Sequence, residues 1–149
     1  MLKKNKTNED LLFNNILLLS RNKIFFTNFN LKDTFENRIN LIFIHISFIF
    51  IKLKSNKLNN NNNSFYQKLF DIVFKKIEIN MREIGYGDVV VNKNMRYLLK
   101  VFYNILLNIE NFSKKTTIVK KKFFLEHLKH ENNDKNLNIL HLIQYFEKY

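Results

Sequence analysis

The chain has 149 residues, of which 46% are hydrophobic and 26% are charged, and this size and balance indicate one globular domain and are too small for two ordinary ones. It contains no cysteine, which excludes disulfide bonds and thiolate zinc sites. The net charge of +12 leaves two explanations open: either A/T-rich codons have enriched lysine, or a basic surface contacts RNA or anionic lipid.

The N-terminal part of the chain predicts one full helix and one short one. Thr7 has the position of an N-cap with Asp10 three residues later, so the first helix is expected from Asn8 to Leu19. A second short helix or turn is expected over 22–29. Its phenylalanines have the spacing of core residues, with a partner-binding patch as the alternative. The basic N-terminus is followed by acidic and polar residues, so no secretory signal is expected.

Asp33 to Glu36 has the form of a helix start, and this third helix is expected to continue to about Lys54. It contains the most apolar run of the chain, LIFIHISFIFI, over 41–51. A membrane-spanning helix needs about 20 apolar residues. This run is shorter and is interrupted by His45 and Ser47, so it predicts the buried centre of a helical bundle.

One row of the third helix is cationic or titratable and recurs every seven residues: Arg38, His45 and Lys52. This spacing keeps the three side chains within about 40° of one another around the helix. Two interpretations stay open. The row either pairs with acidic side chains of the following helix (Asp71, Glu78 or Glu83), or it forms the basic edge of a groove whose apolar floor suits a hydrophobic client helix. His45 by itself is expected to be a hydrogen-bonded structural histidine.

An asparagine-rich stretch over 55–63 predicts a mobile polar loop. After it, Ser64 and Gln67 have the form of a capping box that starts a fourth helix. Its apolar residues recur at spacings of three and four and are Leu69, Phe70, Val73, Phe74, Ile77, Met81 and Ile84. Its other side offers two acid-before-base pairs, Asp71–Lys75 and Glu78–Arg82.

The fourth helix ends at the two glycines of the chain. Gly85 stands where a glycine in the left-handed conformation ends a helix, and a turn with an apolar exit is expected over 85–91. We expect backbone geometry to require both Gly85 and Gly87. Asp88 is expected to hydrogen-bond within the turn or to pair with a base such as Arg38. A nucleotide site is not predicted, because a helix precedes the glycines and no third glycine follows.

The rest of the chain predicts three more helices. The first runs from Asn92 to Glu110 with a basic side (Lys93, Arg96 and Lys100). Residues 114–122 are strongly basic, and the second helix runs through Phe123, Phe124 and Leu128 to a polar loop over 131–136. The third runs from Leu137 to Tyr149. His127, His130 and Glu131 have helix-face spacing, but two nitrogens without a clear third ligand do not predict a metal site. No combination of residues typical of a catalytic site is found.

Residues 69–93, LFDIVFKKIEINMREIGYGDVVVNK, resemble the signature of the ubiquinol–cytochrome c chaperone family. The positions that match it residue for residue are Leu69, Phe70, Asp71, Phe74, Arg82, Glu83, Gly85, Gly87, Asp88, Val91 and Lys93. Lys76 and Asn92 depart from it, where the family has an acid and a glycine. Weaker likeness extends the resemblance over roughly residues 11–112.

The resemblance implies a non-enzymatic chaperone or assembly factor for cytochrome b of the ubiquinol–cytochrome c reductase (bc1) complex, without a cofactor, metal or small-molecule substrate. The implied partners are apo or newly made cytochrome b, a ribosome or a second assembly factor, and the surface of an anionic membrane. The implied location is cytoplasmic and peripheral to the inner membrane in a bacterium, or the matrix side in an organelle. Residues implied to bind the client or to fix the fold are Arg38, His45, Asp71, Arg82, Glu83, Gly85, Gly87, Asp88 and Lys93.

The sequence therefore predicts an all-α, single-domain bundle of six to seven helices around two central amphipathic helices, the third and the fourth. The domain is expected to span residues 1–149, with 113–149 matching the family weakly. The alternative function is that of a small basic helical protein that binds RNA or an anionic membrane surface nonspecifically, through the clusters over 93–100 and 114–122.

Overall fold

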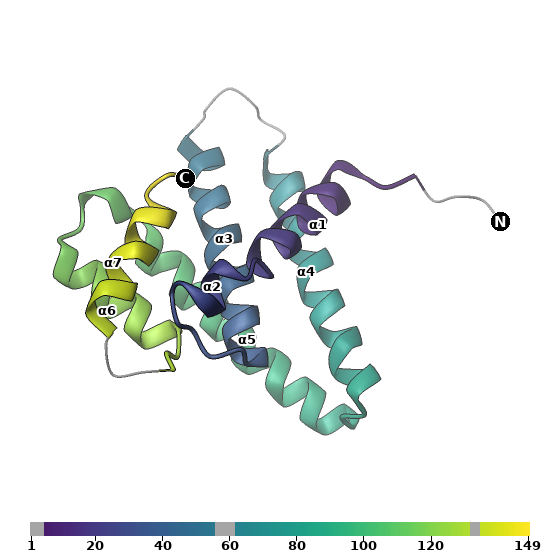
Figure 1. The fold of residues 1–149 in the computed structure, drawn as a ribbon. Helices are drawn as coiled ribbons and strands as arrows, with labels where there is room; N and C mark the ends of the chain where they lie inside the picture. The colour runs from purple at the N-terminus through teal and green to yellow at the C-terminus, as the bar shows by residue number, and fades with distance from the viewer. Residues whose placement is uncertain (1–4, 56–61, 132–134) are drawn as a thin grey trace.

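The computed structural model describes residues 5–55, 62–131 and 135–149. In these residues the regular elements are helices. One isolated β-bridge pairs Leu31 with His130. The elements are α1 (Asn8–Ser20), α2 (Ile24–Thr27), α3 (Phe35–Ser55), α4 (Asn62–Ile84), α5 (Asp88–Ile109), the 3₁₀-helix η1 (Phe112–Lys114), α6 (Thr117–His127) and α7 (Lys135–Phe146) (Figure 1). The prediction of an all-α, single-domain bundle is confirmed.

Two helices begin at threonine caps that the sequence indicates. The Thr7 hydroxyl accepts a hydrogen bond from the Asp10 N–H at 3.2 Å, and the Asp10 carboxylate accepts one from the Thr7 N–H at 3.2 Å. This reciprocal capping box satisfies two N–H groups that the first turn of α1 would otherwise leave without partners. At the start of α3, Thr34 Oγ1 accepts from the Asn37 N–H at 3.2 Å.

Helix α3 lies at the centre of the bundle, as its apolar run predicts, and its residues 39–47 are buried. It packs most extensively against α5, while α1 crosses both α3 and α4 (Figure 1). Helices α3 and α4 pack less extensively against each other than either packs against α1. The two helices expected at the centre are thus joined largely through their neighbours.

Aromatic rings connect α3 to α4 and α5. Phe43 of α3 stacks on Phe74 of α4 with ring centroids 5.5 Å apart, and it meets Phe102 of α5 edge to face at 5.3 Å. Phe70 stacks on Phe74 at 4.5 Å. Such pairs each contribute about 0.5–1.5 kcal/mol beyond the burial of their area. The family signature therefore supplies core contacts through Phe70 and Phe74.

Buried asparagines tie α3 to the segment after α6. The Asn37 side chain donates to the carbonyls of Lys32 (2.7 Å) and Lys129 (2.8 Å) and accepts from the Lys129 N–H (2.9 Å). Asn40 donates to the carbonyl of His127 at 2.7 Å. These bonds satisfy backbone groups that have no helical partner, so they hold α6 and the chain after it against α3.

Two predicted helix starts are wrong. Helix α4 begins at Asn62, so Ser64 lies inside its first turn and Gln67 donates to Asp71 at 2.9 Å instead of closing a capping box. Helix α5 begins at Asp88, four residues before the predicted start at Asn92, because the valines predicted to form the apolar exit of the turn belong to its first turn. The ends at Ile84 and near Glu110 agree with prediction.

The predicted mobile loop over 55–63 falls largely on residues 56–61, which lie outside the described residues; Ser55 ends α3 and Asn62 begins α4. The predicted polar loop over 131–136 includes residues 132–134, which also lie outside them. Among the helices that the structure describes, none combines the length and apolar content needed to cross a bilayer.

Candidate functional site

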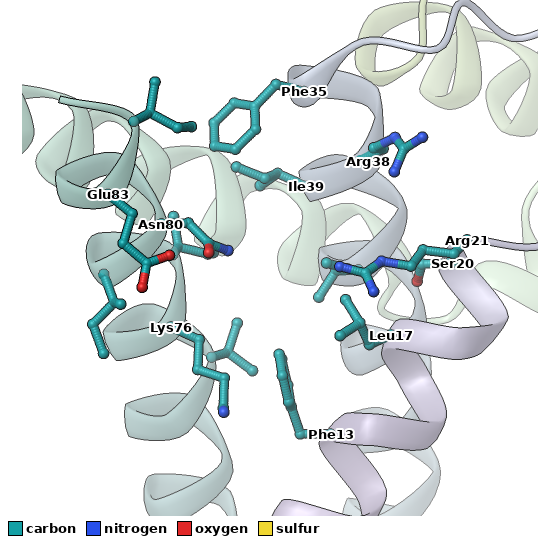
Figure 2. Close-up of a pocket in the computed structure, with 15 residues that line it drawn as sticks. Phe13, Leu17, Ser20, Arg21, Phe35, Arg38, Ile39, Lys76, Asn80 and Glu83 are labelled. Atoms are coloured by element: carbon teal, nitrogen blue, oxygen red, sulfur yellow. The ribbon is translucent and has the colours of Figure 1, made fainter. Parts of the chain in front are cut away.

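A pocket of about 640 Å³ opens between α1, α3 and α4. Its floor is apolar and includes Phe13 and Leu17 of α1, Ile39 and Ile42 of α3, and Val73 and Ile77 of α4. It exists because α1 crosses α3 and α4 where those two helices diverge. We call it the α1–α3–α4 groove. Figure 2 shows α4 on one side and α1 with α3 on the other.

The rim of the groove exposes large apolar side chains. Ile84 at the end of α4 is 63% exposed, Phe35 at the start of α3 is 46% exposed, and Ile79 on α4 is 43% exposed. Single exposed apolar residues are ordinary on a protein surface, but three around one hollow are typical of a binding site. The groove is large enough for the apolar side chains of one helix face.

Charged side chains stand around the apolar floor on both walls. Arg21 and Arg38 lie on the α1 and α3 side, and Lys76 and Glu83 lie on α4 (Figure 2). Glu83 is the one acid among the described lining residues. The rim is therefore mainly basic.

Two of the three basic side chains are already held by other groups. Arg38 forms a two-pronged ion pair with Asp33 (Nε to Oδ1, 2.6 Å), which lowers the pKa of Asp33 and raises that of Arg38. Lys76 lies over the Phe13 ring, 5.7 Å from its centroid. Arg21 has no carboxylate within 4 Å among the described residues. Arg21 is therefore the cation best placed to meet a charge brought in by a ligand.

The predicted row of Arg38, His45 and Lys52 does not act as one unit. Arg38 lines the groove, His45 is buried and Lys52 is exposed elsewhere on α3. The expected pairs with acids of α4 are wrong, because Arg38 pairs with Asp33 in its own N-terminal segment. Of the second interpretation, in which the row forms the basic edge of a groove with an apolar floor, only Arg38 lies at the observed pocket. Arg21 at the end of α1 and Lys76 of α4 supply its other basic side chains.

His45 is the buried, hydrogen-bonded histidine that the sequence predicts. Its Nδ1 lies 2.6 Å from the Leu41 carbonyl and 3.4 Å from the Ser20 hydroxyl, and its Nε2 lies 3.0 Å from the Tyr145 hydroxyl. Burial lowers the pKa of His45 to about 4, so the ring is neutral near pH 7. It joins α1, α3 and α7 in the core.

The α4–α5 corner contains five of the family-signature residues, namely Arg82, Glu83, Gly85, Gly87 and Asp88. Gly85 has φ of +106°, its N–H donates to the Arg82 carbonyl at 3.0 Å, and the Tyr86 N–H donates to the Met81 carbonyl at 3.2 Å. These two bonds form a Schellman motif, which needs a residue at positive φ. Arg82 bonds Glu78 within α4 and Asp88 at the start of α5. The signature thus fixes the angle at which α5 leaves α4.

The remaining predicted site residues lie apart from one another. Gly87 is the N-cap of α5 at φ −71° and ψ 163°, and an added Cβ would meet no atom within 4 Å, so the expectation that geometry requires this glycine is wrong. Asp88 pairs with a base, as one of the two expectations states, but that base is Arg82 and not Arg38. Asp71 is exposed on α4, and Lys93 is exposed on α5. Glu78–Arg82 is the one predicted pair that the structure forms, whereas Asp71 bonds Gln67.

Sequence reasoning missed the contribution of α1 to the groove, because Phe13, Leu17 and Arg21 look like ordinary residues of an amphipathic helix. Ile79 offered a usable signal, since it is apolar but falls outside the periodic series of α4. For metals, no cluster of three histidine, aspartate or glutamate side chains that could hold an ion occurs in the part of the chain that the structure describes.

Comparison with known proteins gives one family and one solved structure. The family model described as ubiquinol-cytochrome C chaperone matches residues 27–115. The crystal structure of the Cbp3 homolog from Brucella abortus superposes with a TM-score of 0.71 at 22% sequence identity, covering 90% of this chain and 73% of that chain. At this identity the likeness establishes the fold. No curated protein matches the chain in sequence.

Proposed function

Because the chain belongs to the ubiquinol-cytochrome C chaperone family, we propose that it shields an apolar helix of cytochrome b in the α1–α3–α4 groove during assembly of the bc1 complex. The protein acts by binding and performs no chemistry on its client. The observation that carries the proposal is the groove itself, with its apolar floor and the exposed Phe35, Ile79 and Ile84 on its rim.

The physical need for such a groove follows from the client. A membrane protein that has not yet bound its cofactors and partners exposes apolar helices, and these aggregate in water. A groove between helices can cover one face of such a helix through side chains at positions i, i+3, i+4 and i+7. The basic rim keeps the groove accessible from water and disfavours a client segment with cationic flanks.

The residues to which the family resemblance points have different roles in this proposal. Glu83 and Arg38 line the groove and face the client directly. Arg82, Gly85 and Asp88 act indirectly, because they set the end of α4 and so the position of Ile84 at the rim. His45 stabilises the fold, and Lys93 lies away from the groove.

The proposal is tested in cells that lack the chain. We expect cytochrome b to accumulate poorly and bc1 activity to fall, and the intact chain should restore both. An Ile79→Asp variant should fold and fail to restore them, because it places a charge on the apolar rim. Ile118→Asp is the matched control, since Ile118 is 80% exposed on α6 and outside the groove.

A photo-crosslinking amino acid at the same two positions tests contact with the client. Position 79 should form an adduct with cytochrome b, and position 118 should not. Normal accumulation of cytochrome b without the chain, or equal crosslinking at both positions, contradicts the proposal.

A further inference from the structure

One side of α5 faces away from the bundle and is chemically distinctive. Its residues follow at spacings of three and four, so they lie in one stripe along the helix: Val89, Lys93, Arg96, Lys100, Tyr103 and Leu107. All six are exposed, and we call them the outer face of α5. The opposite side carries the core residues Val91, Leu98, Phe102, Ile105 and Ile109.

Apolar side chains stand at both ends of the outer face. Val89 is 82% exposed and Leu107 is 69% exposed, values that leave most of each side chain in water. Next to Val89, the α4–α5 corner adds Ile84 (63%) and Tyr86 (47%). Of these exposed apolar residues, Ile84 also lines the α1–α3–α4 groove.

The three cations in the middle of the outer face have no acidic partner. Residues 89–109 contain no aspartate or glutamate. The two acids that bound the helix are occupied, since Asp88 binds Arg82 and Glu110 lies 3.8 Å from Lys54. Among the described residues, no carboxylate lies within 4 Å of Lys93, Arg96 or Lys100.

The other basic cluster of the chain differs in this respect. Around α6, Lys115 donates to the Asn108 carbonyl, Lys120 pairs with Glu147 and Lys122 lies 3.8 Å from Glu126. Of the five lysines over 114–122, Lys120 and Lys122 thus have a carboxylate partner, whereas Lys114 and Lys121 have no carboxylate within 4 Å among the described residues. The outer face of α5 differs in that none of its three cations has a carboxylate within 4 Å among the described residues, and aliphatic side chains flank them along the same stripe.

We propose that the outer face of α5 docks on the surface of an anionic lipid bilayer. Lys93, Arg96 and Lys100 meet the lipid phosphates, and Val89 and Leu107 enter the boundary between headgroups and acyl chains. An RNA partner would use the cations and the tyrosines, but aliphatic side chains offer no ring on which a base can stack. The aliphatic residues therefore favour a bilayer.

This docking goes beyond client binding and does not depend on it. It would place the open end of the groove, through Ile84, beside the membrane that receives an apolar helix. The charges act together over a short range, so docking should weaken as salt rises.

Tryptophan fluorescence tests the proposal directly, because the chain contains no tryptophan. In Val89→Trp, phosphatidylcholine vesicles that contain phosphatidylglycerol should shift the emission to the blue, and brominated acyl chains should quench it. Ile118→Trp is the matched control, because Ile118 is 80% exposed and, like Val89, is the second residue of its helix. A response at position 118 alone, or at neither position at low salt, overturns the proposal.

Charge variants supply the second measurement. Each cation near an anionic bilayer contributes about a fivefold gain in affinity, so the variant with Lys93, Arg96 and Lys100 changed to Gln should bind these vesicles on the order of a hundredfold more weakly. The control changes Lys52, Lys75 and Lys114 to Gln, which removes the same charge from exposed positions elsewhere. Equal loss in both variants overturns the proposal. A different outcome is that the charge variant loses binding to a mixed-sequence RNA while the indole of Val89→Trp does not insert into vesicles. That combination would assign the outer face of α5 to nucleic acid.

Discussion

The Nε2 atom of His45 lies 3.0 Å from the hydroxyl of Tyr145, a residue 100 positions later in the chain. This contact joins the central helix α3 to the last helix, α7, in a part of the core that also contains Phe25 and Phe146. Burial keeps the imidazole of His45 neutral in the folded protein. The C-terminal helices are therefore attached to a side chain whose protonation opposes folding.

The stability of the fold should therefore depend on pH through His45. Its pKa falls to about 4 in the folded protein from 6.5 in the unfolded chain, so the unfolded chain binds the proton more readily. The stabilisation is complete above pH 6.5 and is lost as the pH falls toward 4. Between pH 7 and pH 5 the loss should be about 2 kcal/mol.

Urea unfolding at the two pH values measures this loss. The control is His45→Gln, which can hydrogen-bond but does not titrate. It should be less stable than the parent at pH 7, and its free energy of unfolding should change less between pH 7 and pH 5. An equal pH dependence in both proteins would show that other groups control the acid sensitivity.

The two glycines of the family signature should respond differently to the same substitution. Gly85→Ser should lower the free energy of unfolding by about 1–3 kcal/mol, because a side chain is strained at φ of +106°. Gly87→Ser should leave it unchanged or raise it by a few tenths of a kcal/mol, since serine is a favoured N-cap and has room there. A larger loss at Gly87 than at Gly85 would contradict this account of the corner.

Local signals explain which features the sequence predicts well. Thr7 and Gly85 act on neighbouring backbone groups, so their helix ends could be placed from a few residues. The start of α5 could not be placed in this way, because Val89 and Val90 by themselves resemble an extended segment. The ion pair between Arg82 and Asp88, which marks the first turn of α5, is visible only in the structure. A short apolar run does not by itself distinguish a strand from a first helical turn.

The groove depends on contacts between distant segments, and for that reason only part of it was predicted. Periodicity identifies the apolar residues of α4, and the family resemblance points to Arg38 and Glu83. Neither shows that α1 crosses α3 and α4 and brings Arg21 to the same rim. The buried role of Asn37 was hidden by composition, since asparagine is abundant throughout the chain.

Asn37 should be among the most sensitive polar residues of the core. Replacement by alanine removes two donated bonds and one accepted bond to backbone groups, and it should cost about 3 kcal/mol of unfolding free energy. Asn40→Ala removes one such bond and should cost about 1–2 kcal/mol. Asn80→Ala is the exposed control and should stay within about 0.5 kcal/mol of the parent. Equal effects at all three positions would show that these bonds do not hold α6 to α3.

The charges on the groove rim should tune client affinity in opposite directions. Arg21 and Glu83 stand on facing walls (Figure 2), and both are exposed, so each should change affinity by about two- to fivefold at low salt. For a cytochrome b helix with an acidic flank, Arg21→Gln should weaken binding and Glu83→Gln should strengthen it. Raising the salt concentration should reduce both effects, because exposed charges are screened. Lys75→Gln removes a charge from α4 outside the groove and should leave the affinity unchanged. If neither groove variant changes the affinity, the charge of the rim has no part in the selection of the client.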